Sequence, residues 1–332
     1  MTSVAARTLP DPSLPLDADA AADAFACILD GKVGDAELAD FLTRLADRGE
    51  TVTEIVAAAF ALRSRQRFSP QAPDAIDVCG TGGDNKLSLN VSTAVSIVVA
   101  ACGVKVAKHG NRAASSSSGA ADVLAELGVP ELPVDRLGPC LDAVGITFLH
   151  AARHHPAMAR VAPVRRALRR RTIFNLLGPL ANPAGVKRQL VGVFAHNWTL
   201  PMAQAFAQLG AVRAMVVHGD GYDELAVSGH SDFALAVGTA VTTGTITPGD
   251  VGLDLHPAEA LAGGDAKYNA GRLRALLAGE AGAYHDIVVL NAAAALTVAD
   301  EQLTLLQGAA RAREALANGA ARDVLARWSN FR

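Results

Sequence analysis

The first part of the chain carries apolar side chains at the spacing of an amphipathic helix. Within residues 19–67 they recur every three and four positions, as at Phe25, Ile28 and Leu29, which is the period of one helical face. Glycines divide the stretch into three short predicted helices: Gly31, Gly34 and Gly49. A proline-marked segment at 69–74 then ends the helical pattern and predicts the boundary of a small N-terminal helical domain.

Beyond this boundary, short apolar runs alternate with longer helical ones. The first elements are a strand at 75–79, a helix at 91–102, a strand at 104–107 and a helix at 118–127. This order is a βαβ unit, which requires parallel strands with helices packed on the sheet. The remaining predicted elements are strands at 190–195, 213–217, 233–237, 241–246 and 251–255, and helices at 201–209, 270–278, 286–298 and 301–328. We therefore expect an α/β fold with a mostly parallel central sheet.

Composition narrows the class of protein. The 332 residues are 50% apolar and 19% charged, with 30 basic against 33 acidic side chains and a formal net charge of −3. This near balance gives no electrostatic basis for binding nucleic acid. Aromatic residues make up only 5% of the chain, whereas glycine occurs 30 times. Many positions are therefore expected where the backbone turns tightly or approaches a ligand closely.

The sequence gives no sign of a secreted or membrane protein. Its four cysteines lie far apart without a Cys-x-x-Cys pair, so neither a disulfide framework nor a zinc site is indicated. Residues 1–22 lack the apolar core of a signal peptide. The longest apolar stretch, 91–106, is interrupted by polar side chains and is too short to cross a bilayer. We expect a soluble, cytoplasmic protein.

A glycine-rich turn follows the first predicted strand and precedes a helix. The turn and the start of that helix supply Gly80, Thr81, Gly82, Gly83, Asp84, Asn90, Ser92 and Thr93. Converging backbone N–H groups and the positive end of a helix dipole suit a phosphate group. A tight turn with ordinary hydroxyl caps explains the same residues, so the turn by itself leaves both interpretations open.

A polar loop follows the second predicted strand. It contains Lys108, His109, Asn111 and Arg112, at the end of the strand where open α/β sheets bind ligands. Such a loop can hold an anion together with a planar polar ligand, although a solvated basic loop has the same composition. The hydroxyls of 115–118 follow at the predicted start of a helix. They indicate a second anion site in which at least one hydroxyl is a helix cap.

Two adjacent acids, Asp223 and Glu224, follow the apolar strand at 213–217. Carboxylates of this kind suit Mg2+, a hard cation that is shared with substrate phosphates. A surface Asp-Gly turn is the ordinary alternative. The presence of two candidate phosphate loops in the same chain favours the metal site.

Basic residues crowd the segment before Thr172. On a helix Arg165 and Arg169 share one face while Arg166 and Arg170 share the next, so only part of the cluster can face one ligand. His154 and His155 precede the cluster as neighbours, which is poor spacing for helical metal ligands. They are interpreted as loop residues, one of them a candidate to line a site.

Taken together and in this order, these motifs closely resemble the anthranilate phosphoribosyltransferase family over about residues 21–298. The resemblance implies a helical domain at 1–72, joined by part of 150–180, and an α/β domain at 73–332 of the nucleoside phosphorylase and phosphoribosyltransferase type. It also implies a homodimer, Mg2+ as cofactor, and transfer of the phosphoribosyl group of 5-phosphoribosyl diphosphate to the amine of anthranilate. This reaction belongs to tryptophan biosynthesis and needs no covalent intermediate.

The resemblance further implies which residues bind each substrate. Those for 5-phosphoribosyl diphosphate are Gly80, Thr81, Gly82, Gly83, Asp84, Ser88, Asn90, Ser92, Thr93, Lys108 and Ser117. Those for anthranilate are Gly80, His109, Asn111, His154, Arg165, Gly178 and Pro179, and those for Mg2+ are Ser92, Asp223 and Glu224. No side chain is expected to act as a covalent nucleophile, because anthranilate brings its own amine.

The chain departs from the family pattern at two places. Asn85, Ser88 and Leu89 stand where the family usually has Gly, Thr and Phe, and the sequence 167–169 replaces Glu-Leu-Gly with Ala-Leu-Arg. The second change removes an acid and adds a cation, which would draw an anionic acceptor more strongly.

Two other functions are compatible with parts of the pattern. A pyrimidine nucleoside phosphorylase shares the fold, but its phosphate signatures differ from 108–112 and it does not need the pair Asp223 and Glu224. A non-catalytic relative that binds nucleic acid has only the arginine cluster in its favour, because the net charge is −3.

Overall fold

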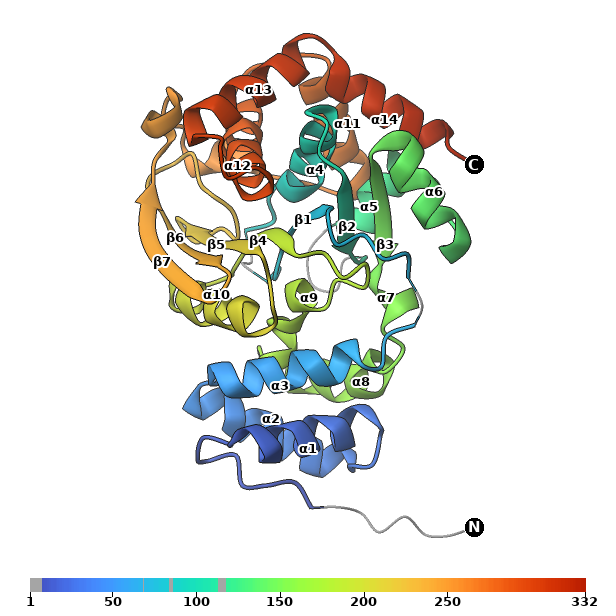
Figure 1. Ribbon diagram of the computed structural model, residues 1–332, viewed down its shortest axis with the longest axis vertical. Coiled ribbons are helices and arrows are strands. Elements are labelled where there is room, and N and C mark those ends of the chain that lie inside the picture. Colours follow the sequence, from blue (N-terminus) through green and yellow to red (C-terminus); the bar gives the residue numbers. More distant parts are fainter. Residues whose placement is uncertain (1–7, 68, 84–85, 113–117) are drawn as a thin grey trace.

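The structure, a computed structural model, describes residues 8–67, 69–83, 86–112 and 118–332. It has a small helical part, drawn at the bottom of Figure 1, and a larger α/β part above it. The helical part contains α1 (Ala18–Leu29), α2 (Asp35–Arg48), α3 (Val52–Arg63) and α8 (Met158–Leu168). The three N-terminal helices confirm the prediction, and α8 returns from the α/β part to pack on α1 and α2.

One sheet organises the α/β part. Its strands, in the described part of the chain, lie in the order β3-β2-β1-β4-β5-β6-β7. Their bounds are β1 Ile76–Gly80, β2 Val106–Gly110, β3 Ile146–His150, β4 Arg188–Gly192, β5 Arg213–Gly219, β6 Ser231–Val237 and β7 Ala240–Ile246. Neighbours from β3 to β5 are parallel, while β6 and β7 are antiparallel. The expected α/β fold with a mostly parallel sheet is confirmed, and the carboxyl ends of β1, β2, β4 and β5 share one edge.

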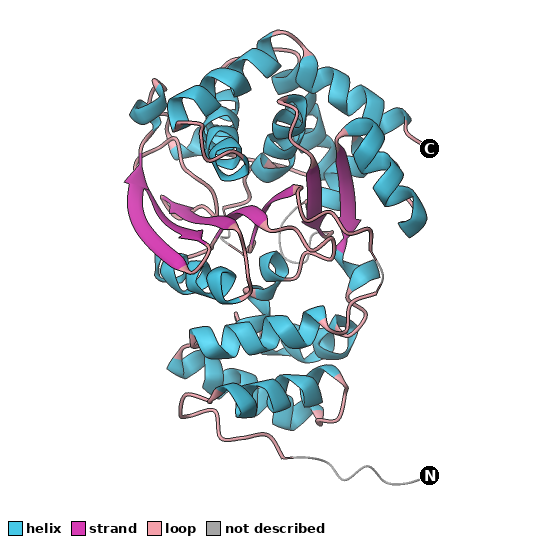
Figure 2. Cartoon of the chain, viewed as in Figure 1, coloured by secondary structure: helices cyan, strands magenta, loops and turns pink. Residues whose placement is uncertain are grey.

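Helices cover both faces of this sheet (Figure 2). On one face lie α4 (Val91–Ala101), α12 (Ala283–Ala299), α13 (Leu305–Ala317) and α14 (Ala320–Asn330), accompanied by α5 (Ala120–Glu126), α6 (Val134–Val144) and α11 (Ala266–Leu277). On the other face lie α9 (Leu177–Leu180) and α10 (Thr199–Gln208), against which α3 packs. The short α7 (Ala151–His154) follows β3 directly. No helix in the described ranges is both long and apolar enough to cross a membrane.

The helical part shares its core with the sheet. Along β5, Met215 and Val217 belong to the core on the α4 and α12 side, while Ala214 and Val216 belong to the core that contains Phe25 and the other buried residues of α1 to α3. This alternation is the two-residue period of a strand. The N-terminal helices are therefore held on the second face of the sheet by common apolar burial rather than by a linker alone.

Close helix packing explains why the chain has so few aromatic residues. Nearly every residue of α12 is buried, and most of them are small. A Cβ at Gly308 of α13 would lie 2.8 Å from the carbonyl oxygen of Ala293 on α12, closer than a real Cβ contact. Small side chains thus allow the helix backbones to approach each other.

The structure corrects some predicted elements. The single helix predicted at 301–328 is wrong, because Gly319 adopts φ +82° and separates α13 from α14. The strand predicted at 251–255 is also wrong: a 3-10 turn at Pro248–Val251 and the left-handed Gly252 interrupt any extended path. The sequence reasoning missed α6, whose Gly138 and Pro139 hide the helical pattern, and the edge strand β3.

We predict that Glu54→Ala destabilises the helical part. Glu54 is fully buried, caps α3 through the backbone N–H of Thr51 at 2.7 Å, accepts from Leu16 N at 3.0 Å and pairs with Arg48 at 2.6 Å. Its removal leaves Arg48 buried without its partner, at a cost of about 3 kcal/mol in the free energy of unfolding. Urea denaturation measures this change. Asp142→Ala removes the exposed pair with Lys105 and should cost less than about 1 kcal/mol; equal effects would contradict the prediction.

Candidate active site

The acidic pair lies directly on the glycine-rich turn. The Oδ2 atom of Asp223 accepts a hydrogen bond from the backbone N–H of Gly82 at 2.7 Å. A Cβ at Gly80 would lie 2.1 Å from that carboxylate, and one at Gly192 would lie 1.3 Å from the carbonyl oxygen of Asp223. The loop after β5 can therefore reach the ends of β1 and β4 only because both strands end in glycine.

The three predicted metal ligands line one small cavity: Ser92, Asp223 and Glu224. Asn291 of α12 also lines it and fixes the backbone after the acids, because its Oδ1 accepts from Leu225 N at 2.9 Å and its Nδ2 donates to Leu225 O at 2.8 Å. Two carboxylates and a hydroxyl are hard oxygen ligands of the kind that Mg2+ prefers. The residues present therefore fit this ion.

Lys108 brings a cation to the same place. Its side chain is only 1% exposed, and Nζ donates to Val78 O at 2.7 Å and to Ser92 Oγ at 3.3 Å. Burial lowers the pKa of Lys108, while the carboxylates of Asp77, Asp223 and Glu224 act in the opposite direction. The ammonium group thus faces the acidic pair across the start of α4, as expected for a residue that would contact phosphate oxygens.

The start of α4 is held by an amide network. The Oδ1 atom of Asn90 accepts from Asn269 Nδ2 at 2.9 Å and from Ser118 Oγ at 3.2 Å. The hydroxyl of Thr93, which is 1% exposed, has no hydrogen-bond partner among the described residues. The Thr81 hydroxyl accepts from the backbone N–H of Phe194 at 3.1 Å and so serves the fold. The buried Thr93 hydroxyl is therefore available to a ligand group at the start of α4.

Ser88 lies between the glycine-rich turn and α4. It forms an isolated bridge with Ala262 and thereby fixes the path of the chain toward α4. Asp84 and Ser117, like the departure at Asn85, lie outside the described residues, so the roles predicted for Asp84 and Ser117 stay predictions.

The second half of the site begins at His109. Its Nδ1 donates to the carbonyl oxygen of Gly178 at 3.1 Å, and its Nε2 has no partner among the described residues. Burial lowers the pKa of His109 to about 3, so the ring is neutral and Nε2 carries a lone pair. The ring of His155 lies against it at a centroid distance of 5.3 Å and donates from Nε2 to Ala181 O at 2.8 Å. Backbone carbonyls of the α9 region thus fix the tautomers of both rings.

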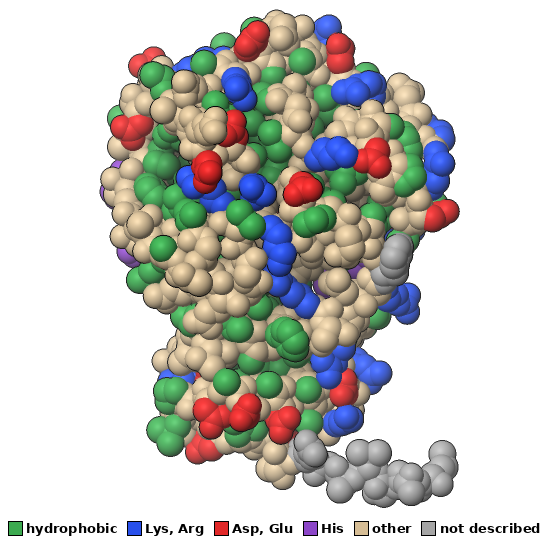
Figure 3. All heavy atoms as spheres, in the orientation of Figure 1, with side chains coloured by type: hydrophobic (Ala, Val, Ile, Leu, Met, Phe, Trp, Pro, Cys, Tyr) green, Lys and Arg blue, Asp and Glu red, His purple; other side chains and the backbone are tan. Residues whose placement is uncertain are grey.

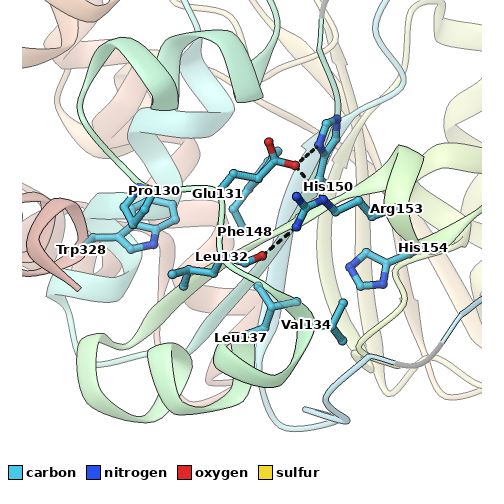
Figure 4. A pocket seen from close by; sticks show the side chains of 10 residues that line it. All are labelled: Pro130, Glu131, Leu132, Val134, Leu137, Phe148, His150, Arg153, His154 and Trp328. Atoms are coloured by element: carbon cyan, nitrogen blue, oxygen red, sulfur yellow. Dashed lines mark hydrogen bonds and ion pairs between the residues drawn. The ribbon is translucent and has the colours of Figure 1, made fainter. Parts of the chain in front are cut away.

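Other predicted acceptor residues surround this pair. A Cβ at Gly178 would meet no heavy atom within 4 Å, so this residue borders open space, whereas Pro179 is buried beside it. Asn111 is exposed at the end of β2. His154 is buried and lines a neighbouring cavity with Phe148 and Trp328 (Figure 4). The structure also brings the ring of His155 against that of His109, a contact that the sequence did not predict.

The arginine cluster divides into an inward and an outward part. The predicted pairing of Arg169 with Arg165 on one helical face is wrong, because α8 ends at Leu168 and the exposed Arg169 follows with φ +49°. Arg165 is largely buried, which lowers its pKa, and its guanidinium lies 5.9 Å from the ring of Phe174. Arg166 and Arg170 are exposed, and Arg170 pairs with Asp47 at 2.6 Å. On the face drawn in Figure 3, Lys and Arg side chains form a band where the α/β part meets the helical part. Only part of the cluster thus faces inward.

Sequence reasoning missed several residues at this site. Arg171 donates to the carbonyl oxygen of Gly83 and stacks on Phe194 at 4.2 Å, so it braces the glycine-rich turn from the acceptor side. Asp77 is fully buried, accepts from the backbone N–H of His109 at 3.1 Å and binds Asn182 at 2.8 Å. Asp77 could have been found as the single acidic residue inside a predicted apolar strand. For Arg171 the only signal in the sequence was its membership of the arginine cluster.

This two-part architecture with a phosphate turn and an acidic pair is that of a known class of transferases. Residues 72–322 match the glycosyl transferase family, a/b domain, and residues 13–65 match its helical bundle domain. The chain is 50% identical over 325 residues to the anthranilate phosphoribosyltransferase of Novosphingobium aromaticivorans, covering 96% of this chain and 98% of that one. It is 52% identical over 315 residues to that of Rhodospirillum rubrum, covering 94% and 91%.

The solved structures that resemble this chain belong to the same family as these relatives. The anthranilate phosphoribosyltransferase of Thermus thermophilus matches with a TM-score of 0.90 and 44% identity over 96% of each chain. That of Saccharomyces cerevisiae, solved in complex with PRPP (5-phosphoribosyl diphosphate) and Mg, matches with a TM-score of 0.84 and 26% identity over 94% of this chain and 92% of that one. The chain belongs to the anthranilate phosphoribosyltransferase family.

We predict that Gly192→Ala lowers kcat/KM strongly without unfolding the protein. The added methyl group would overlap the backbone of Asp223, and displacing a substrate-binding loop by about 1 Å costs on the order of 100-fold in kcat/KM. Steady-state kinetics beside circular dichroism checks this. Gly271→Ala, whose Cβ meets nothing within 4 Å, should stay within about twofold of the parent; a fully active Gly192→Ala would refute the close approach.

Proposed function

We propose that this site transfers the phosphoribosyl group of 5-phosphoribosyl diphosphate to the amine of anthranilate, giving N-(5-phosphoribosyl)anthranilate and diphosphate in tryptophan biosynthesis. The observation that carries this assignment is the hydrogen bond from Gly82 N–H to the Asp223 carboxylate at 2.7 Å. It joins the candidate metal ligands to the candidate phosphate turn, and Lys108 lies between them. A diphosphate and its metal ion need this combination.

The leaving group binds at the glycine-rich turn and the start of α4 in this proposal. The residues are Gly80, Thr81, Gly82, Gly83, Asp84, Ser88, Asn90, Ser92, Thr93, Lys108 and Ser117, with Ser92, Asp223 and Glu224 holding Mg2+. Backbone N–H groups and Lys108 stabilise the negative charge that grows on diphosphate as the bond to ribose breaks. Mg2+ bound there would neutralise phosphate charge. No covalent nucleophile is needed.

The acceptor binds between β2 and the α8–α9 segment. The carboxylate of anthranilate would contact the guanidinium of Arg165 and the amide of Asn111. Its amine would donate a hydrogen bond to His109 Nε2, which stays unprotonated because burial lowers the pKa of His109. Gly80, His154, Gly178 and Pro179 complete the predicted set, and His155 joins it because it packs on His109. A largely buried arginine suits a carboxylate because the surrounding low dielectric strengthens their attraction.

Domain organisation, assembly and location are also part of the proposal. We assign 1–72 with part of 150–180 to the helical domain and 73–332 to the α/β domain, supported by the packing of α8 on α1 and α2. A cytoplasmic homodimer is proposed through the helical domain. Large apolar side chains on that domain support it, since Leu14 is 70% exposed and Phe60 is 66% exposed, and such exposure favours a partner surface.

We predict that the chain consumes anthranilate only with 5-phosphoribosyl diphosphate and Mg2+, and that Asp223→Asn with Glu224→Gln abolishes this activity. Loss of both charges should reduce turnover by at least about 1000-fold, because metal binding and leaving-group stabilisation fail together. The decay of anthranilate fluorescence measures it.

Asp220→Asn is the matched control, because Asp220 lies in the same turn with φ +50°, a conformation that asparagine tolerates. It should retain activity within about twofold. No decay with the parent, together with phosphate-dependent cleavage of thymidine or uridine, would identify a nucleoside phosphorylase instead.

We predict that Arg165→Ala raises the KM for anthranilate by roughly tenfold, the loss expected for one charge-assisted contact. The KM for 5-phosphoribosyl diphosphate should stay unchanged. Initial-rate kinetics with each substrate varied separates the two constants, and the exposed neighbour Arg166→Ala provides the control. A rise confined to the diphosphate substrate would mean that the two halves of the site are assigned wrongly.

A further inference from the structure

The side chain of His150, at the end of the edge strand β3, connects an acidic residue to Asn111. Its Nδ1 lies 2.9 Å from Glu131 Oε1, and its Nε2 lies 3.1 Å from Asn111 Oδ1. Figure 4 shows Glu131 between the ring of His150 and the guanidinium of Arg153, which lies 2.8 Å from the same oxygen. His150 is well shielded, with 12% of its side chain exposed.

Glu131 can only accept a hydrogen bond from this ring. The pKa of Glu131 is lowered mainly by the hydrogen bond with His150 and further by Arg153 and Arg112, so the carboxylate is ionised. An ionised carboxylate has no proton to donate. The Nδ1 atom of His150 therefore carries the hydrogen of this bond.

The oxygen of Asn111 is identified independently. Its Oδ1 accepts a hydrogen bond from the backbone N–H of Arg112 at 2.9 Å, which the amide nitrogen could not do. The Nε2 atom of His150 therefore also faces an acceptor and must donate. Both ring nitrogens of His150 thus face oxygen acceptors, and the hydrogen bond to Asn111 needs the hydrogen on Nε2.

The consequence is that the amide of Asn111 is held in one orientation. Its oxygen is turned to His150 and Arg112, and among the described residues its Nδ2 has no acceptor. An amide NH2 group that is left available can donate to a carboxylate, whereas a flipped amide would present its oxygen and repel it.

Charged and aromatic side chains surround His150. Arg153 of α7 and Arg112 after β2 face Glu131, and Arg112 also lies 3.3 Å from Asp122 of α5. The ring of Phe148 on β3 lies 6.1 Å away. Two guanidinium groups thus balance two carboxylates around the ring, and Glu131 is held in place from both sides.

We propose that His150, held by Glu131, is a positioning residue that fixes the Asn111 amide with its NH2 group toward the carboxylate of the acceptor. The proposal rests on the proposed function, in which Asn111 contacts that carboxylate. Without the Nε2 donor the amide of Asn111 is no longer held with its oxygen toward His150, and acceptor binding weakens.

The test compares His150→Phe, Asn111→Ala and the double variant by initial-rate kinetics with each substrate varied. His150→Phe should raise the KM for anthranilate about tenfold, with kcat and the KM for 5-phosphoribosyl diphosphate within about twofold. In the Asn111→Ala background the same change should have no further effect, because the group that His150 orients is gone. Equal effects of His150→Phe in both backgrounds, or none in the parent, would overturn the proposal.

Rescue by a conservative variant distinguishes orientation from simple packing. His150→Gln keeps one donor for the Oδ1 atom of Asn111 and should recover part of the affinity for anthranilate that His150→Phe loses. A KM for anthranilate in His150→Gln that is no lower than in His150→Phe would contradict the proposed role.

His196→Phe is the matched control, since His196 also pairs with a carboxylate through Nδ1, Asp232 at 2.9 Å, on an exposed surface. It should leave both KM values unchanged. An Asn111→Ala variant with an unaltered KM for anthranilate would overturn the acceptor assignment and this inference together. A raised KM for anthranilate in Asn111→Ala, together with an unchanged KM in His150→Phe, would overturn the inference about His150 alone.

Discussion

The hydrogen bond between the Asp223 carboxylate and the backbone of Gly82 holds the two halves of the phosphate site together. It brings the loop after β5 onto the turn after β1, although 141 positions separate the two residues in the sequence. The approach is possible because Gly80 and Gly192 end their strands without a side chain. Asn291 then fixes the loop from the α12 side. The glycine-rich turn and the loop that carries the acidic pair are therefore a single structural unit.

The acceptor half depends on the way the helical part is attached. Its helices bury their apolar faces against the second face of the sheet, and the chain from β3 to β4 crosses between the two parts as α7, α8 and α9. This crossing places Arg165 near Phe174 and sets the carbonyl of Gly178 against His109. Packing at the domain junction thus determines where an aromatic acid would meet the activated sugar. Such a junction can also exclude water from the reacting bond.

Much of the fold was predictable because it follows from local periodicity. The three N-terminal helices and the strands β1, β2 and β4 to β7 arise from clear helical or strand patterns bounded by glycine or proline. The failures have local physical causes too. Gly319 interrupts an otherwise continuous helical pattern, and Pro139 conceals the helical character of α6. The edge strand β3 was missed although Ile146, Phe148 and Leu149 are apolar, and His150 at its end was missed with it.

Motifs such as 80–84 and 108–112 are contiguous and specific, so the amino-acid sequence was enough to indicate the family, the two substrates that the resemblance implies and the types of residue that carry the chemistry. Which of these residues meet was settled by the folded chain. It placed His155 against His109, brought Arg171 to the glycine-rich turn and joined His150 to both Glu131 and Asn111. The reason is that hydrogen-bond partners distant in the chain are selected by the register of parallel strands and the packing of helices, which no local pattern encodes.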